Sequence, residues 1–238
     1  MTAEALRALH VPGDPLILPN VWDADTARLV EDAGFPVVAT SSVAVAASLG
    51  YPDGEVAPVA EMFAAAARIA GAVSVPVTVD AEAGYGLAGP EFAERLLATG
   101  AVGCNYEDTD HAAGGLRPVA EQAARLAAVR AAAGRDLVIN ARIDVFLRAA
   151  DARSVLPEAI ERARAYLDAG ADCVYPILLR DPAVLAEFVR AVSPAAVNAG
   201  GPDFAALANL GVARISLGAG LWRETRGWLA EHLRTLRA

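Results

Sequence analysis

The sequence predicts an α/β fold, specifically a (β/α)8 TIM barrel. Short apolar runs rich in β-branched residues alternate with longer, alanine-rich amphipathic runs, and eight such pairs fill the 238 residues. A doubly wound open sheet shows the same alternation, but it usually has about five to seven strands and a glycine-rich first turn. The segment after the first expected strand here reads Asn-Val-Trp-Asp-Ala-Asp. The count of eight therefore favours the barrel.

Each expected strand is a short apolar run, and each expected helix is a longer segment with apolar residues three and four positions apart. In chain order the expected strands are Leu16–Pro19, Val37–Thr40, Val75–Asp80, Val102–Glu107, Leu137–Ala141, Cys173–Tyr175, Ala196–Asn198 and Arg214–Ser216. The expected helices are Ala24–Ala33, Val59–Ala72, Glu91–Ala98, Val119–Ala133, Pro157–Ala169, Ala183–Ala191, Phe204–Leu210 and Leu221–Leu236.

Glycine ends four of these helices, at Gly34, Gly100, Gly170 and Gly211, and each glycine leads into the next strand. Glycine is favoured there because it adopts the left-handed conformation that closes a helix. No linker, low-complexity tract or shift in composition interrupts this recurring joint. We therefore expect one barrel domain that spans residues 1–238.

The overall composition excludes several classes of protein. The formal net charge is −9, whereas a nucleic-acid binder needs a basic face. Although 55% of the residues are hydrophobic, no apolar run approaches the roughly 20 residues of a membrane span. No signal sequence is recognisable at the start of the chain. We expect a soluble, cytoplasmic protein with neither a membrane nor a nucleic acid as partner.

Every basic side chain is arginine, and the sequence contains no lysine. Schiff-base aldolases, pyridoxal enzymes and Walker-type nucleotide hydrolases are excluded, because each needs a lysine amine or ammonium group. Cys104 and Cys173 lie far apart without a CxxC partner, which indicates a reducing compartment. The three histidines show no HxxxH or HExxH spacing, so a histidine-rich metal centre is not expected.

Unusual polar residues gather where the expected strands end, and the carboxyl ends of the strands carry the active site of a TIM barrel. Residues two positions apart on a strand share a face, as do Asp80 with Glu82 and Asn140 with Arg142. Several acids near one arginine in a dry pocket need a cation, and oxygen donors suit Mg²⁺ or Mn²⁺. The alternative is that each acid merely caps the next helix.

Four segments resemble the isocitrate lyase / phosphoenolpyruvate mutase superfamily from about Leu18 to the end of the chain. They read ATSSVAVAASLGYPD, VTVDAEAGYG, GCNYED and INARID. The resemblance implies a barrel that binds Mg²⁺ and acts on 2-oxo or 2-hydroxy acids, with chemistry at C–C or P–C bonds. It also implies a homodimer or homotetramer in which the last helix is exchanged, with Trp222 and Trp228 at the interface.

The resemblance also assigns roles by position. Ser41, Ser42 and Val43 would hold a substrate carboxylate; Asp80 would bind the metal; Glu82, Glu107 and Asp53 would hold metal-bound waters; Arg142 would neutralise a carboxylate or enolate oxygen.

Three features depart from the pattern of the superfamily. Ser42 replaces a glycine and Glu82 replaces an aspartate. The loop Thr109–Gly115 lacks both the Lys-Lys-Cys-Gly-His segment of isocitrate lyases and the lysine and asparagine of the mutases. Within that loop, His111 is the one side chain that titrates near neutrality, so it is a catalytic candidate. The alternative is a solvated loop histidine.

Five further residues carry expectations from their positions. Asn198 ends the seventh strand and is a candidate for substrate binding, and Trp22, after the first strand, is a candidate pocket residue. Both cysteines are expected in the core. Arg214 begins the last strand, so we expect it at the opposite, structural end of the barrel.

The sequence thus predicts a Mg²⁺-dependent lyase or decarboxylase that cleaves a C–C bond in a small 2-oxo or 2-hydroxy (di)carboxylic acid through an enolate-like intermediate. Its catalytic residues would be Arg142, Glu107 and His111. The alternatives are a P–C bond enzyme, such as a phosphonopyruvate hydrolase or mutase, and a non-catalytic, metal-dependent binder of oxo acids.

Overall fold

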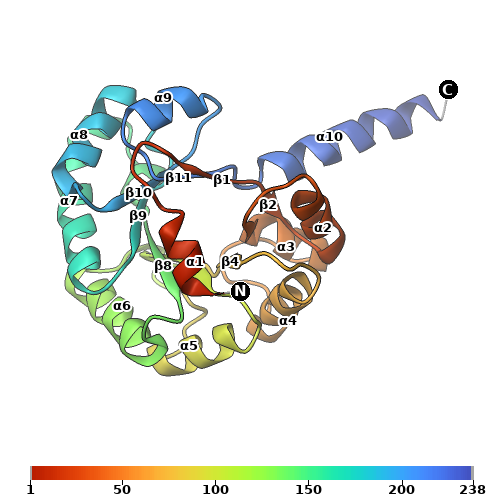
Figure 1. Cartoon of the computed structure of the whole chain (residues 1–238), viewed down its shortest axis with the longest axis horizontal. Helices are drawn as coiled ribbons and strands as arrows, with labels where there is room; N and C mark the ends of the chain where they lie inside the picture. The colour runs from red at the N-terminus through yellow and green to blue at the C-terminus, as the bar shows by residue number, and fades with distance from the viewer. Residues whose placement is uncertain (1, 237–238) are drawn as a thin grey trace.

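The structure, a computed structural model, describes residues 2–236 and shows the parallel barrel in Figure 1. Hydrogen-bonded strands follow one another in the order β1, β11, β10, β9, β8, β5, β4, β3, β2. Their bounds are β1 Leu16–Leu18, β2 Asn20–Val21, β3 Val38–Thr40, β4 Val77–Asp80, β5 Gly103–Glu107, β8 Val138–Ile143, β9 Cys173–Pro176, β10 Ala196–Ala199 and β11 Arg214–Ser216. Residues 1, 237 and 238 of the expected domain lie outside the described residues, and the single-domain organisation stays a prediction.

The first expected strand is divided in two at Pro19. β1 pairs with β11, with Leu16 opposite Arg214, whereas β2 pairs with β3, with Asn20 opposite Ala39. Proline lacks the N–H group that a continuous ladder needs, so the strand changes partner at this residue. Within residues 2–236, the nine parallel strands therefore occupy eight positions of the barrel. The expected TIM barrel is confirmed.

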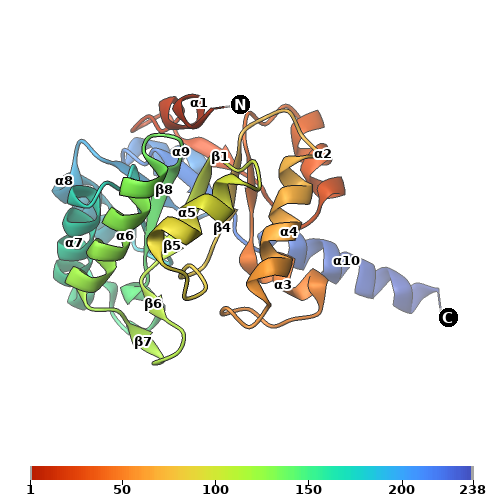
Figure 2. The ribbon, with the colours of Figure 1, turned by 90° about the horizontal axis from the view of Figure 1, so that it is seen from below.

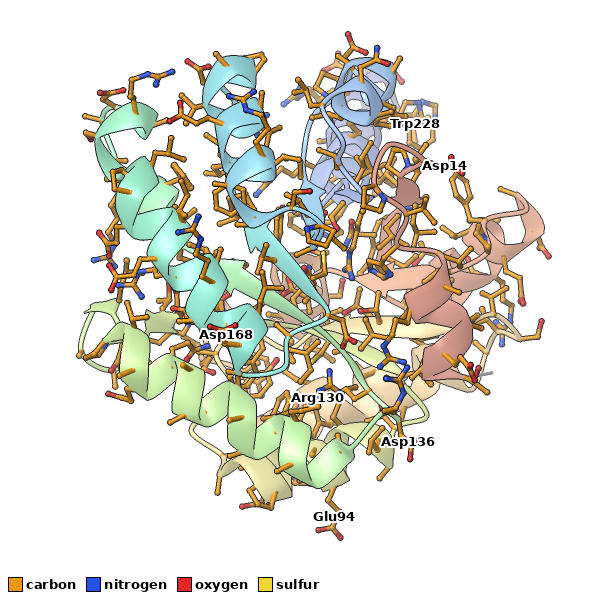
Figure 3. All side chains as sticks on the ribbon, turned by 60° about the vertical axis from the view of Figure 1, so that its left-hand side comes forward. Asp14, Glu94, Arg130, Asp136, Asp168 and Trp228 are labelled. Carbon is orange, nitrogen blue, oxygen red and sulfur yellow. The ribbon has the colours of Figure 1, made fainter. Side chains whose placement is uncertain are left out.

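The helices cover the outside of the barrel. Their bounds are α1 Ala3–Ala8, α2 Ala24–Asp32, α3 Ser42–Leu49, α4 Val59–Ala70, α5 Gly89–Leu97, α6 Val119–Ala133, α7 Ala152–Asp168, α8 Pro182–Val192, α9 Phe204–Asn209 and α10 Gly220–Thr235. Charged side chains such as Glu94 on α5 and Asp168 on α7 point outward, as labelled in Figure 3. The four glycines of the predicted helix-to-strand joints have φ between 85° and 98°, as expected for this cap.

Several elements differ from the expectations. α1, α3, the hairpin of β6 (Thr109–Asp110) with β7 (Gly115–Leu116), and the 3-10 turn Val145–Leu147 were not expected. These segments are too short to show a clear period. α7 begins five residues before Pro157, because the Asp151 carboxylate accepts a hydrogen bond from Arg153 N at 3.0 Å and caps the helix there.

The amino end of the barrel is closed by α1, which lies across it in Figures 1 and 2. Leu6 is fully buried there and packs in a cluster with Leu16, Leu18 and Val138. A Cβ on Gly103 would lie 2.7 Å from Leu6 Cδ2, so the glycine leaves room for α1, which forms a plug at this end of the barrel. The Asp172 carboxylate pairs with Arg7 and Arg130 at 2.6 and 2.5 Å, which joins α1 to α6 (Arg130 is labelled in Figure 3).

The carboxyl end carries the β6–β7 hairpin, which lies on the side away from α1 in Figure 2. Near this end the last helix, α10, projects away from the barrel. No helix within residues 2–236 is both long and apolar enough to cross a membrane.

Candidate active site

A cavity of about 810 Å³ opens at the carboxyl end of the barrel. It receives residues from segments that follow most of the strands, so it lies where a TIM barrel places its chemistry. Nine of the predicted site residues line it: Ser41, Ser42, Val43, Asp53, Asp80, Glu82, Glu107, His111 and Arg142. The strand-end pattern in the sequence therefore located the cavity.

The last residue of β4, Asp80, is held by the start of α3. Its Oδ2 accepts hydrogen bonds from Ser42 N at 3.1 Å and Ser42 Oγ at 2.9 Å. Its Oδ1 accepts a longer bond of 3.4 Å from Asn105 Nδ2. The Ser41 amide donates to Val21 O, so the amides of Ser41 and Ser42 are both engaged within the protein. Val43, the next residue of α3, also lines the cavity.

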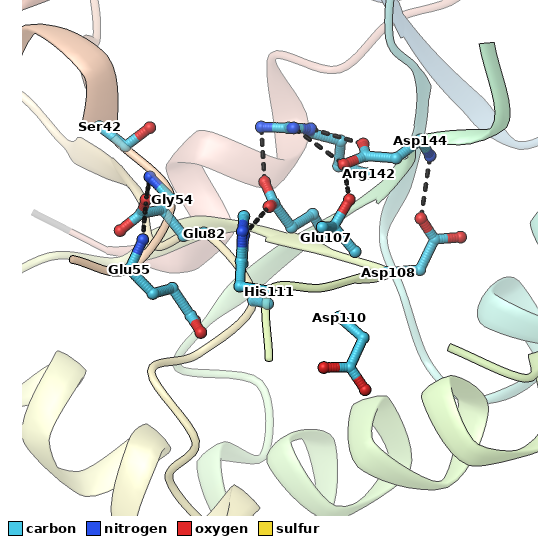
Figure 4. A network of polar contacts seen from close by, with 12 residues as sticks. Ser42, Gly54, Glu55, Glu82, Glu107, Asp108, Asp110, His111, Arg142 and Asp144 are labelled. Carbon is cyan, nitrogen blue, oxygen red and sulfur yellow. Dashed lines mark hydrogen bonds and ion pairs between the residues drawn. The ribbon is translucent and has the colours of Figure 1, made fainter. Parts of the chain in front are cut away.

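The Glu82 carboxylate holds the loop that follows α3. Its Oε1 accepts hydrogen bonds from Gly54 N and Glu55 N, both at 2.9 Å (Figure 4). Glu82 itself has a φ of 47°, a left-handed conformation that is unusual for a residue with a side chain. Burial raises the pKa of Glu82, and the nearby Asp53 and Asp80 carboxylates raise it further. This acid is thus placed by strained backbone in an anionic environment.

Glu107 lies between the two other catalytic candidates, as Figure 4 shows. Its Oε2 is 2.6 Å from Arg142 Nη1 and its Oε1 is 2.6 Å from His111 Nε2. Burial raises the pKa of Glu107, against the opposing effect of Arg142. The hydrogen bond to Glu107 raises the pKa of His111. The loop histidine is therefore partly buried and paired with a buried carboxylate, and its catalytic role stays a prediction.

Arg142 is oriented by a second carboxylate behind it. Asp144 accepts from Arg142 Nε at 2.7 Å and from Nη2 at 2.9 Å. Asp144 N in turn donates to Asp108, which also accepts from Tyr166 OH at 2.7 Å and Arg162 Nη1 at 3.1 Å. The guanidinium is thus fixed in position by two acids of the protein, and its charge is already largely balanced before any ligand binds.

Two predicted pocket residues do not line the cavity. Asn198 is fully buried below it, where its Nδ2 donates to Ser216 Oγ at 3.1 Å. Trp22 packs against the hydrophobic core next to Asp23, the residue that caps α2. Neither residue is among those that line the cavity, and the predicted binding role of both stays a prediction. Both cysteines are fully buried and free, as predicted.

The expected position of Arg214 holds for its backbone but not for the end of its side chain. Its backbone begins β11, but the side chain runs along the interior of the barrel and reaches the layer beneath the cavity. There Arg214 Nη2 donates to Asn105 Oδ1 at 3.0 Å. A long side chain that starts at the amino end of a strand can span most of a short barrel, which the position of its Cα does not reveal.

The cavity also has lining residues that the sequence analysis did not single out. They are Asn20, Asn105, Thr109, Leu147, Arg148, Tyr175, Ile177, Leu178, Arg180, Gly200, Gly201, Pro202 and the segment 216–221 with Arg223 and Glu224. Most of them follow β8, β9, β10 and β11. Position after a strand end was the available signal, but these segments lack the clustered acids that drew attention to the first five strands.

The chain matches known proteins over nearly its whole length. The phosphoenolpyruvate phosphomutase family profile covers residues 6–237. A crystal structure from Burkholderia cenocepacia J2315, provisionally assigned as a phosphonomutase, is 44% identical and superposes with a TM-score of 0.93, covering 98% of this chain and 99% of that one. A phosphonopyruvate hydrolase in complex with oxalate and Mg²⁺ is 26% identical, with a TM-score of 0.87, and covers 100% of this chain and 87% of that one.

The 2-methylisocitrate lyase of Escherichia coli K12 is 33% identical over an alignment of 201 residues, and the match covers 79% of this chain and 66% of that enzyme. The match thus spans just under two thirds of the length of that relative. These similarities agree with the barrel and with the cavity at its carboxyl end. The chain belongs to the isocitrate lyase / phosphoenolpyruvate mutase superfamily, which includes C–C lyases and mutases.

Proposed function

We propose that the protein is a Mg²⁺-dependent, or Mn²⁺-dependent, carbon–carbon lyase that acts on a small 2-oxo or 2-hydroxy (di)carboxylic acid. One observation carries this proposal: within residues 53–107, four carboxylates line the cavity at the carboxyl end of the barrel, and one fixed arginine lines it with them. The acids are Asp53, Asp80, Glu82 and Glu107, and the arginine is Arg142.

These carboxylates suit a cation that keeps several water ligands better than a cation bound by protein ligands alone. Within residues 2–236, no three His, Cys, Asp or Glu side chains lie close enough to hold a metal ion together. Mg²⁺ commonly keeps several waters and takes only one or two protein carboxylates. Asp80 would be the direct ligand, and Glu82, Glu107 and Asp53 would hold waters. Such an ion supplies Lewis-acid stabilisation of negative charge on a chelating oxo acid.

The remaining groups act on the substrate itself. The N-terminus of α3, with Val43 N–H and the hydroxyl of Ser41, would receive a carboxylate. Arg142 would stabilise the oxygen on which negative charge develops as the C–C bond breaks. His111 Nε2, which shares a proton with Glu107 Oε1, would deliver that proton to the enolate-like product. It would thereby replace the cysteine acid of the isocitrate lyase loop.

A P–C bond enzyme is the second candidate, supported by the phosphomutase family match and the phosphonopyruvate hydrolase neighbour. The loop Thr109–Gly115 argues against a mutase, because it offers neither a lysine nor an asparagine to a transferring phosphoryl group. A non-catalytic binder of oxo acids is the third candidate.

The test is turnover of a panel of 2-oxo and 2-hydroxy acids, with phosphonopyruvate included, in Mg²⁺ and in EDTA. Oxalate binding is measured in parallel by calorimetry. A lyase cleaves one of the carboxylic acids only with metal; release of phosphate from phosphonopyruvate supports the second candidate. Tight oxalate binding without any turnover supports the binder.

We also propose that α10 packs on a second copy of the chain, with Trp222 and Trp228 at the contact. The helix has no buried residue, and Trp228, Leu233 and Leu236 are 65%, 51% and 70% exposed. Large apolar side chains along one projecting helix are typical of an interface. Light scattering at micromolar concentration should give a dimer or tetramer, and Trp228→Glu should shift it toward monomer. A monomeric parent protein contradicts this proposal. A cytoplasmic location stays a prediction.

A further inference from the structure

A buried arginine without a carboxylate partner lies directly beneath the proposed site. Arg214 is 1% exposed and forms none of the ion pairs found within residues 2–236. Its Nη2 donates to Asn105 Oδ1 at 3.0 Å, and its Nε lies 3.4 Å from Ser216 Oγ. Its Nη1 has no partner among the described atoms. One charged group thus enters the barrel interior with only neutral acceptors.

Such an arrangement destabilises the folded state, so a purely structural role does not explain it well. An unpaired charge loses its hydration on burial, and an apolar side chain of similar volume often stabilises a core better than buried charges do. Methionine or leucine would fill the same space among Cys104, Cys173 and the strand backbones. The contacts that Arg214 does make therefore deserve a functional explanation, and the shortest of them is to Asn105.

Arg214 determines the orientation of the Asn105 side-chain amide, that is, the sides on which its Oδ1 and Nδ2 lie. Asn105 Oδ1 accepts from Arg214 Nη2 and also from Asn140 Nδ2 at 2.7 Å. With two donors facing its oxygen, the amide must turn its Nδ2 toward the other side, where Asp80 Oδ1 lies 3.4 Å away. Asp80, Asn105 and Asn140 are register partners on β4, β5 and β8, so the three side chains form one layer.

We propose that Arg214 is a positioning residue that acts through Asn105 on Asp80. The guanidinium keeps the amide N–H of Asn105 directed at Asp80 Oδ1, while Ser42 holds Oδ2. The carboxylate of Asp80 is thereby held at both oxygens, in one orientation toward the cavity. This inference rests on the proposed function, in which Asp80 is the direct ligand of the metal.

The first test measures Mn²⁺ affinity by calorimetry, with circular dichroism and urea unfolding on every variant. We expect Arg214→Gln to weaken Mn²⁺ binding about 10-fold, within the range found for groups behind a metal ligand. Arg214→Lys, which keeps a cationic donor, should recover part of that loss. On an Asn105→Ala background, Arg214→Gln should cause no further loss of affinity, although it still lowers stability.

The matched control is Arg130→Gln, which removes a partly buried arginine at the Asp172 cluster near the amino end. This variant should lower the urea midpoint and leave Mn²⁺ affinity unchanged. If Arg214→Gln binds Mn²⁺ like the parent, or if its effect adds fully to that of Asn105→Ala, the inference is overturned.

A second measurement separates this inference from the proposed function. The side-chain NH₂ signals of Asn105 in a ¹H–¹⁵N spectrum of the metal-free protein are assigned by their loss in Asn105→Ala. They should shift in Arg214→Gln and stay in place in Arg130→Gln. A parent that binds no Mn²⁺ defeats the metal-dependent function, whereas unmoved Asn105 signals in Arg214→Gln defeat the positioning role.

Discussion

The two ends of the barrel use buried polar groups in opposite ways. At the amino end, the Asp172 carboxylate meets two arginines at 2.6 and 2.5 Å, and Leu6 fills the space between the strands. At the carboxyl end, acids outnumber cations: Glu107 and Asp144 share Arg142. The first arrangement balances its charges within the protein, whereas the second leaves an excess of negative charge that the proposed metal ion would offset.

Backbone strain follows the same division. Within residues 2–236, the non-glycine residues with positive φ are Glu55, Glu82, Tyr85 and Leu178. Glu82 and Leu178 line the cavity, and Glu55 contacts both Glu82 and Tyr85 through backbone amides. Strain of this kind is retained where side chains must be aimed, and its restriction to one end indicates where the function lies.

The largest expected effect comes from removing the proposed metal ligand. Asp80→Ala should abolish measurable binding of Mg²⁺ or Mn²⁺, a loss beyond the roughly 10–100-fold caused by groups behind the ligands. Its fold should be intact, because the change removes one charge from an acid-rich cluster. Calorimetry with Mn²⁺ tests this, with the exposed Asp168→Ala on α7 as control. Parental affinity in Asp80→Ala removes the basis of the metal site.

The second-largest effect is expected from the loss of the Arg142 guanidinium, which Glu107 and Asp144 share. Arg142→Leu leaves Glu107 and Asp144 buried without their partner, so oxalate affinity in saturating Mg²⁺ should fall by about 2–4 kcal/mol. The titration is made on protein shown to be folded by circular dichroism. Oxalate binding equal to that of the parent would place the anion pocket on backbone amides alone.

A substitution at the amino end should lower stability and leave ligand binding unchanged. Leu6→Ala opens a cavity beneath α1 and should lower the free energy of unfolding by about 3 kcal/mol. Oxalate and metal binding should be unchanged, because the plug lies at the other end from the cavity. Urea unfolding and calorimetry on the same preparation check both halves. Weakened oxalate binding in this variant would show that the two ends are coupled.

The smallest expected effect depends on pH and also concerns the amino end. Burial and the nearby Arg214 lower the pKa of His10 to about 4, with Arg7 lowering it and Asp172 raising it. The unfolded chain therefore binds a proton that the folded chain rejects between about pH 6.5 and 4, and stability falls as pH falls through this range. Between pH 7.5 and 5 the parent should lose about 2 kcal/mol more than His10→Gln in urea unfolding. Equal losses would show that His10 protonates freely in the fold.

The sequence predicted the alternation and the strand ends well, because both depend on local patterns. It could not predict the height of a side chain within the barrel. Asn198 and Arg214 were assigned from their places at the end and at the start of their strands, which locate the Cα atom but not the end of the side chain. Strand tilt and side-chain length decide the layer, and they place Asn198 below the cavity and bring Arg214 up to Asn105. The sequence likewise did not indicate that the strand changes partner at Pro19, because the pairing depends on the neighbouring strands.

That change of partner at Pro19 has a consequence for how the chain reaches its native state. The barrel closes only when β1 pairs with β11, and Gly218 N donates to Asn20 Oδ1 across 198 residues of sequence. During synthesis, the edge of β1 that pairs with β11 therefore stays unpaired until β11 has been made. β1 pairs with β11 only after the segments that separate them in the sequence have been made.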